Sequence, residues 1–335
     1  MGTQILLGVG IGLTSFLLYA SATQFSALAL LLFYLAPLPI MLATLGWGRS
    51  VGIVSGVTAW IGVTAAIAPV AGITYLISVA APSVFLALLA GMSRPVATPA
   101  SLPATSTDTA DKTSTPTPDK STTGQAWYPL GRLVLWTVLW GIVTSAIALV
   151  WFSSGPEGLT GRIRALLDMF VQNPSLPNAQ NETPDALDTA TIDNIVAMMS
   201  RLLFPAVATI WSLTMLGNLW MTGKILLRSK RLQRPWPKIQ AMNYPQMTGF
   251  AFIAALGATM MPGILGKFAI IIAAGLGLAL VLLGLAVVHA LTTGLSTRSL
   301  VLVAVYSAMV LFAWPALLLA AVGLGELIFT LRARF

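Results

Sequence analysis

The stretch MTGKILLRSKRLQRPWPK, residues 221–238, separates two long apolar runs. It contains no acidic residue and six basic ones, which are Lys224, Arg228, Lys230, Arg231, Arg234 and Lys238. Cytoplasmic loops of membrane proteins carry the excess of Lys and Arg, so this stretch predicts a cytoplasmic loop at 224–240. The same six side chains are expected to contact anionic lipid headgroups. The topology of the chain can be counted outward from this loop.

The composition of the chain excludes a soluble domain. The 335 residues are 57% hydrophobic and only 8% charged, whereas soluble domains carry about 25% charged residues. There is no cysteine, so disulfides and thiolate metal ligands are excluded. The net charge of +8 comes mostly from residues beside apolar runs. We therefore expect a lipid bilayer as the partner, and no nucleic acid.

The apolar runs predict an all-α fold, a polytopic membrane helix bundle of about 8–10 spans, since a helix needs about 20 residues to cross the hydrocarbon core. The predicted spans are 4–21, 26–46, 50–69, 71–92, 130–152, 196–223, 247–262, 265–290 and 298–330. This count places the N-terminus in the cytoplasm. The last run is either one tilted helix or a returning hairpin broken at Trp314-Pro315. The hairpin is favoured because it leaves Arg332 and Arg334 on the cytoplasmic side.

Three regions follow from this pattern. Residues 1–92 form an N-terminal four-helix membrane part, and residues 130–335 form a C-terminal membrane part. Between them, the Pro/Thr-rich segment 93–129 predicts a disordered cytoplasmic linker. The acidic segment 153–195 is expected to be an outer loop, opposite the basic loop. Within it, 159–171 has apolar residues at helical spacing and predicts a short amphipathic helix on the outer surface.

Glycines recur at a spacing of four residues in two of the spans. They are Gly8 and Gly12 in the first, and Gly48, Gly52 and Gly56 in the third. Small residues at this spacing let helix backbones approach closely in lipid. The ridges therefore predict either packing inside the bundle or docking of another membrane subunit, and packing is the commoner use.

A substrate cavity is one interpretation of the prolines in the second span. Pro37 and Pro39, followed by Thr44, free backbone carbonyl groups and bend a helix, which can line a cavity or simply kink the span. Tyr34, Asn218 and His289 complete the candidate cavity residues. His289 is the only histidine, so a structural role is favoured over a ligand role.

Four ionisable side chains within the predicted spans are candidates for a role inside the membrane, namely Arg201, Lys267, His289 and Glu326. Those near span ends are expected to reach water along the membrane surface. The chain has neither a Walker A sequence nor HExxH, and a dyad of Ser55 with His289 has little support. We therefore expect no enzymatic activity, cofactor or metal, and the scarcity of acids argues against an autonomous proton pump.

Three stretches together resemble a known family. They are FYLAPLP (33–39) leading to GWG (46–48), GNLW (217–220) running into RPWP (234–237), and GLAVVHAL (284–291). In order and spacing they resemble the YybS-like family of bacterial inner-membrane proteins, a domain of unknown function, and its alphaproteobacterial branch in particular. The likeness covers nearly the whole chain except the Pro/Thr-rich linker and the outer loop.

That family is similar, more distantly, to the substrate-binding S components of energy-coupling-factor vitamin transporters. The resemblance implies a location in the bacterial inner membrane and a docking role for the five glycines. It also implies a substrate-capture or transport component that lacks its own ATPase and works with other membrane subunits. This chain departs from S components in having more spans and no obvious polar pocket. The alternative is a non-transporting scaffold that recruits cytoplasmic proteins or anionic lipid.

Overall fold

The computed structural model describes residues 2–24, 26–97, 123–171 and 189–333. Seven helices in this part of the chain are long and apolar enough to cross a membrane, and three shorter apolar helices accompany them. The predicted all-α membrane bundle is confirmed, and the chain is an integral membrane protein. Helices dominate because a segment inside lipid must satisfy its backbone polar groups within itself.

The N-terminal part has four spans, as predicted. The first is α1 (Gly2–Ala20), followed by the 3₁₀ turn η1 (Ser21–Gln24). The second is divided into α2 (Ala27–Tyr34) and α3 (Pro37–Trp47), and the third is α4 (Arg49–Ala66). The fourth consists of α5 (Pro69–Tyr75), a π-helical turn η2 (Leu76–Ala80) and α6 (Ala81–Gly91).

A two-stranded antiparallel ribbon follows α6, and it differs from the predicted disorder of residues 93–129. Strand β1 (Ser93–Ala97) pairs with β2 (Thr123–Trp127), with Ser93 opposite Trp127. The Tyr128 N–H extends the ladder to the Met92 carbonyl at 3.0 Å. The last residue of α6 and the first residue of the next helix, α7 (Leu130–Ser153), lie close together. The strands that continue from them can therefore pair, which satisfies their backbone N–H and carbonyl groups. The remainder of the predicted linker, 98–122, lies outside the described residues.

The C-terminal part begins with α7 (Leu130–Ser153), α8 (Gly158–Val171) and α9 (Thr189–Arg228). The amphipathic helix predicted at 159–171 is therefore present as α8, and it buries Leu159 and Ile163. Helix α9 is 40 residues long and extends beyond the predicted span at both ends. Lys224 and Arg228 accordingly lie on a helix, and the basic loop begins only at Ser229. Residues 172–188 of the predicted outer loop lie outside the described residues.

After the short turn η3 (Ile239–Ala241) come α10 (Met247–Ala258) and α11 (Gly263–Leu291). The last apolar run forms two helices, α12 (Arg298–Leu311) and α13 (Trp314–Phe329), followed by η4 (Leu331–Ala333). Pro315 lies in the first turn of α13, where its missing N–H costs nothing. Arg332 then donates to the Gln240 carbonyl at 2.5 Å. The returning hairpin is confirmed, and η4 lies beside Gln240, at the end of the basic loop.

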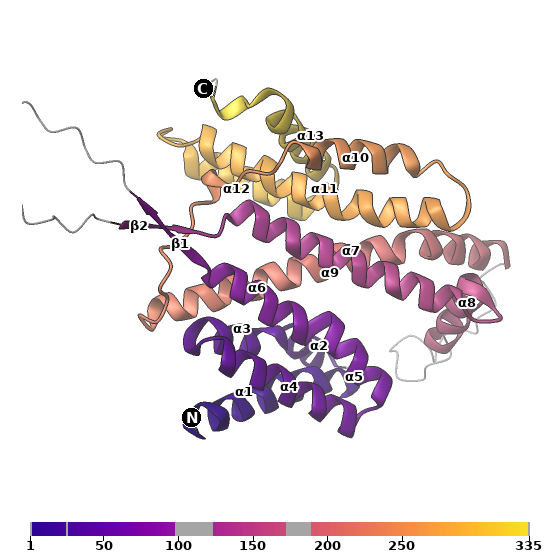
Figure 1. The fold of residues 1–335 in the computed structure, drawn as a ribbon. Coiled ribbons are helices and arrows are strands. Elements are labelled where there is room, and N and C mark those ends of the chain that lie inside the picture. Colours follow the sequence, from indigo (N-terminus) through magenta and orange to yellow (C-terminus); the bar gives the residue numbers. More distant parts are fainter. Residues whose placement is uncertain (1, 25, 98–122, 172–188, 334–335) are drawn as a thin grey trace, which may run out of the picture.

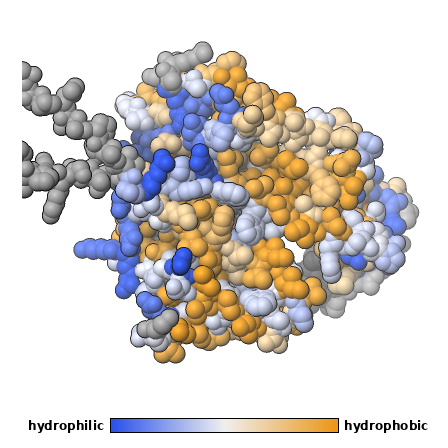
Figure 2. Space-filling view, viewed as in Figure 1, coloured by the Kyte–Doolittle hydropathy of each residue, from blue (hydrophilic) through white to orange (hydrophobic). Residues whose placement is uncertain are grey.

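The long helix α9 contacts α3, α7 and α11, and so joins the two membrane parts. Figure 1 shows the start of α1, the ribbon and the end of α13 at one end of the bundle, and α8 at the other. We call these the basic end and the opposite end. Figure 2 shows hydrophobic residues over the middle of the visible face and hydrophilic residues gathered toward both ends, as expected for a membrane-spanning band.

Candidate functional site

A recess lies between the N-terminal part and α9, about halfway along the helices that form it. Its walls come from α2, α3, η2 and α9, and it encloses about 690 Å³ of space, including the part open to the surroundings. We call it the central recess. It is lined by Phe33, Tyr34, Pro37, Ser78, Val79, Val207, Ile210, Trp211, Thr214 and Met215.

One wall of the recess is the break between α2 and α3, which the two prolines cause. Pro37 and Pro39 have no N–H groups to continue the helical ladder. The Leu38 N–H donates to the Leu35 carbonyl at 3.0 Å instead of to Tyr34. The Tyr34 carbonyl accepts from Asn218 Nδ2 at 2.8 Å. The predicted proline kink is present, and a side chain of α9 supplies the hydrogen bond that the kink removes.

A second wall is the π-helical turn η2, which precedes Pro82. Proline cannot donate to the carbonyls four and five residues before it, those of Ser78 and Ile77. Both accept indole N–H groups from other helices, each at 2.8 Å. Trp211 on α9 donates to Ser78, and Trp140 on α7 donates to Ile77. These two tryptophans were not among the candidates from the sequence, although Pro82 in an apolar span was a visible signal that carbonyls would need donors.

The central recess is therefore largely apolar, with its polar backbone groups already satisfied. The aliphatic hydroxyl groups on its walls donate to carbonyls one turn earlier: Ser78 to Thr74 at 2.6 Å and Thr214 to Ile210 at 2.8 Å. The oxygen atoms of these two hydroxyl groups can still accept a hydrogen bond from a bound molecule. Oδ1 of Asn218, one turn from Thr214, is buried and has no hydrogen-bond partner among the described residues. Such a site suits an apolar molecule with few polar groups.

The structure brings together three of the six candidate cavity residues. Tyr34 and Pro37 line the central recess, and Asn218 is bonded to Tyr34. Pro39 is buried in α3 outside the lining. Thr44 is also buried, and its hydroxyl donates to the Ile40 carbonyl at 2.7 Å.

His289 lies far from the recess, near the basic end, and has a structural environment. Its Nδ1 is 2.9 Å from the Leu285 carbonyl, and its ring meets the Tyr306 ring edge to face. Its own carbonyl accepts from Gln240 Nε2 at 3.3 Å. Gln240 also meets Arg332, which is paired with the buried Glu326 at 2.8 Å. This network fastens the end of α13 to α11 and to the basic loop.

Glycines of the predicted ridges pack against other helices of the same chain. Gly8 and Gly12 face α4, where an added Cβ would meet the side chain of Val54 and the backbone of Ser55. Gly52 faces Thr44 in the same way, and Gly56 lies beside α6 and η2. Gly48 instead joins α3 to α4 with a positive φ of 97°. These faces are already occupied by the chain's own helices.

A closer crossing was missed from the sequence. Gly284 on α11 and Gly323 on α13 lie against each other's helix backbone, at the carbonyls of Leu319 and Leu280. Gly284 lies within one of the stretches that carry the family resemblance. The spacing of small residues around Gly284 did not predict this crossing, because its partner Gly323 is on another helix.

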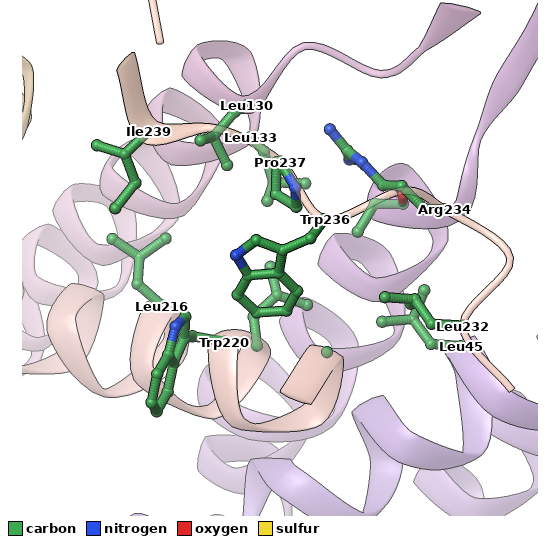
Figure 3. Close-up of a pocket in the computed structure, with 13 residues that line it drawn as sticks. Leu45, Leu130, Leu133, Leu216, Trp220, Leu232, Arg234, Trp236, Pro237 and Ile239 are labelled. Atoms are coloured by element: carbon green, nitrogen blue, oxygen red, sulfur yellow. Dashed lines mark hydrogen bonds between the residues drawn. The ribbon is translucent and has the colours of Figure 1, made fainter. Parts of the chain in front are cut away.

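At the basic end, the loop after α9 folds back over an apolar pocket of about 780 Å³, including its open part. Figure 3 shows the Trp236 indole at the centre of this pocket, pointing toward α9, where Gly223 leaves room for it. Lys224 Nζ lies 4.5 Å from the Trp236 ring centroid and 5.7 Å from that of Trp220. The two rings hold this cation by cation–π attraction.

The six predicted headgroup contacts differ in exposure. Arg234 is half-buried and donates to the carbonyls of Ala90 and Tyr128 at 3.2 and 2.9 Å. Burial lowers the pKa of its guanidinium from the ordinary value, and the group has a structural role. Arg231 lies over the Trp47 ring at 4.7 Å. Five of the six remain exposed: Lys224, Arg228, Lys230, Arg231 and Lys238.

Among the residues that the structure describes, no three metal-ligating side chains come together. No family model, curated protein or solved structure matches the chain.

Proposed function

We propose that this protein captures a largely apolar small molecule in the central recess and acts as a substrate-capture or transport component without its own ATPase. We infer that it belongs to the bacterial inner membrane, with the N-terminus and the basic end in the cytoplasm. The resemblance to the YybS-like family supports this function through the distant similarity of that family to S components. Partner membrane subunits would supply the energy.

The observation that carries the proposal is the construction of the central recess. In lipid, irregular backbone is tolerated only where protein buries it or where it lines a cavity. Here the break before Pro37 and the π turn before Pro82 border the same recess. Asn218, Trp140 and Trp211 hydrogen-bond the carbonyls that these irregularities leave free. Because these carbonyls already have donors, an apolar molecule can occupy the recess without leaving any of them unsatisfied.

The test is native mass spectrometry of the full chain purified in mild detergent, comparing wild type with two variants on α9. Val207 and Leu213 are similarly exposed, at 43% and 47%, but only Val207 lines the recess. Wild type and Leu213→Trp should carry a small molecule that is not a phospholipid, and Val207→Trp should lose it because the indole fills the opening. Retention of the molecule by Val207→Trp would contradict the proposal.

The scaffold function is favoured by a different observation, the five exposed basic side chains at the basic end. Such a surface attracts anionic lipid or acidic protein segments. The same measurement separates the two functions. A co-purifying protein with no small molecule on the wild-type chain would favour the scaffold and exclude the capture component.

A further inference from the structure

Two cationic side chains from different helices line one recess at the opposite end of the bundle. Arg201 comes from α9 and Lys267 from α11, and the recess between them encloses about 780 Å³, including its open part. From the sequence, each of the two side chains was expected to reach water separately, from the end of its own span. The structure instead assigns both to a single surface, which we call the cationic recess.

The charges of the cationic recess are not balanced by the described part of the chain. There, the ion pairs are Arg164 with Asp193 and Arg332 with Glu326. The nearby hydroxyls of Ser200 and Thr259 donate to carbonyls of their own segments at 2.7 Å. They carry no charge of their own. Two like charges that share a recess at a membrane boundary repel each other, and a bound anion would remove this cost.

The first turn of α11 adds to the positive potential of this recess. Gly263 and Gly266 line it, and the start of the helix has no hydrogen bond from a capping side chain. The first N–H groups of a helix have no partner within the helix and carry part of its dipole. Gly266 also lies against the Met261 carbonyl, so a side chain at this position would obstruct the turn. The helix start supports the two side chains but does not define the site alone.

We propose that the cationic recess binds a phosphate group. An arginine, a lysine and free helix amides are the donors that phosphate groups favour in proteins. The recess lies at the end of the membrane-spanning band, next to the exposed side chain of Met260. The phosphate can therefore belong to a phospholipid headgroup or to soluble phosphate.

The test measures the thermal stability of the full chain in detergent with two probes, inorganic phosphate and phosphatidylglycerol. Both probes are titrated into wild type, Arg201→Gln, Lys267→Gln and the double variant. Arg164→Gln is the control, because Arg164 is a cation at the same end whose partner is Asp193. Arg201 is exposed, so its replacement should leave the protein folded.

At least one probe should raise the melting temperature of wild type and of the control. Each single substitution should weaken its apparent affinity about tenfold, as expected for a lost charge-assisted hydrogen bond, and the double variant should show no shift. A response to phosphatidylglycerol alone identifies a lipid headgroup, and a response to both probes identifies the phosphate group itself. The proposal is overturned if neither probe stabilises wild type, or if the double variant responds like the control.

Discussion

Asn218 shows what single residues do in this protein, because one amide group connects the two membrane parts. Its Nδ2 reaches the Tyr34 carbonyl and, within α9, the Thr214 carbonyl, both at 2.8 Å. The sequence indicated that Pro37 and Pro39 would free carbonyl groups. It could not identify the donor, because the donor lies 184 residues away along the chain. Asn218 was a candidate for contact with a substrate, and its hydrogen bonds give it a structural use as well.

The glycines at 52 and 56 make a matched pair for testing close packing. A Cβ at Gly52 would collide with the side chain and backbone of Thr44, whereas one at Gly56 would lie 3.5 Å from Val84, an ordinary contact. We expect Gly52→Ala to lower the free energy of unfolding by about 1–3 kcal/mol through overpacking. Gly56→Ala should be nearly neutral. Reversible chemical unfolding of each variant in detergent measures both free energies.

Gly52→Leu should lose folded protein altogether, since leucine is larger and the helix backbones meet here. If Gly52→Ala and Gly56→Ala change the free energy of unfolding equally, then α3 and α4 do not approach closely at Gly52.

At the scale of elements, the prediction succeeded where apolar length and proline position decide the structure. The four N-terminal spans, the amphipathic helix α8 and the break between α12 and α13 follow from these signals. The ribbon of β1 and β2 was missed because strand pairing depends on two helix ends that meet in space. The π turn was missed because Pro82 alone does not distinguish a kink from a wider turn. In each case the missing information is a contact between distant segments.

The π turn predicts a coupling between Trp211 and Pro82. Trp211→Phe should cost about 1–3 kcal/mol, because it leaves the half-buried Ser78 carbonyl without a donor. In a Pro82→Ala background the restored N–H can satisfy this carbonyl, so the same substitution should cost less. A double-mutant cycle on chemical unfolding in detergent measures the difference. Trp151→Phe is the control, since Trp151 is 61% exposed. Equal costs in both backgrounds would show that Pro82 is not the reason why the Ser78 carbonyl depends on the Trp211 N–H.

At the scale of the whole molecule, α9 organises the bundle. The central recess, the apolar pocket around Trp236 and the cationic recess all include residues of this helix. The sequence indicated the spans on either side of α9, but apolar patterning carries no information on which faces enclose recesses. The pairing of Arg201 with Lys267 in one site is a consequence of how α9 and α11 pack. Residue types alone could not predict it.

The ribbon predicts that residues 98–122 can be replaced by a two-residue turn. Ala97 is opposite Thr123 in the register, and Asn-Gly is the preferred connection between antiparallel strands at this separation. The shortened chain should fold to the same yield, with an unchanged melting temperature in detergent. A chain in which 93–127 is deleted as a whole is the comparison, and it should be less stable because the paired strands are removed and only Met92, Tyr128 and Pro129 remain between α6 and α7. A large loss of stability in the shortened chain would contradict the ribbon as the closing element.

We propose an integral membrane bundle in which the start of α1, the end of α13 and the basic loop lie on the cytoplasmic side. The chain has no native cysteine, so single cysteines can be placed at the exposed positions Thr3, Ser229, Thr330 and Ser154. A thiol reagent that cannot cross membranes is applied to intact cells and to permeabilised cells. Cysteine at Ser154 should react in both, and the other three only after permeabilisation. Labelling of Ser229→Cys in intact cells, or protection of Ser154→Cys, would contradict the account.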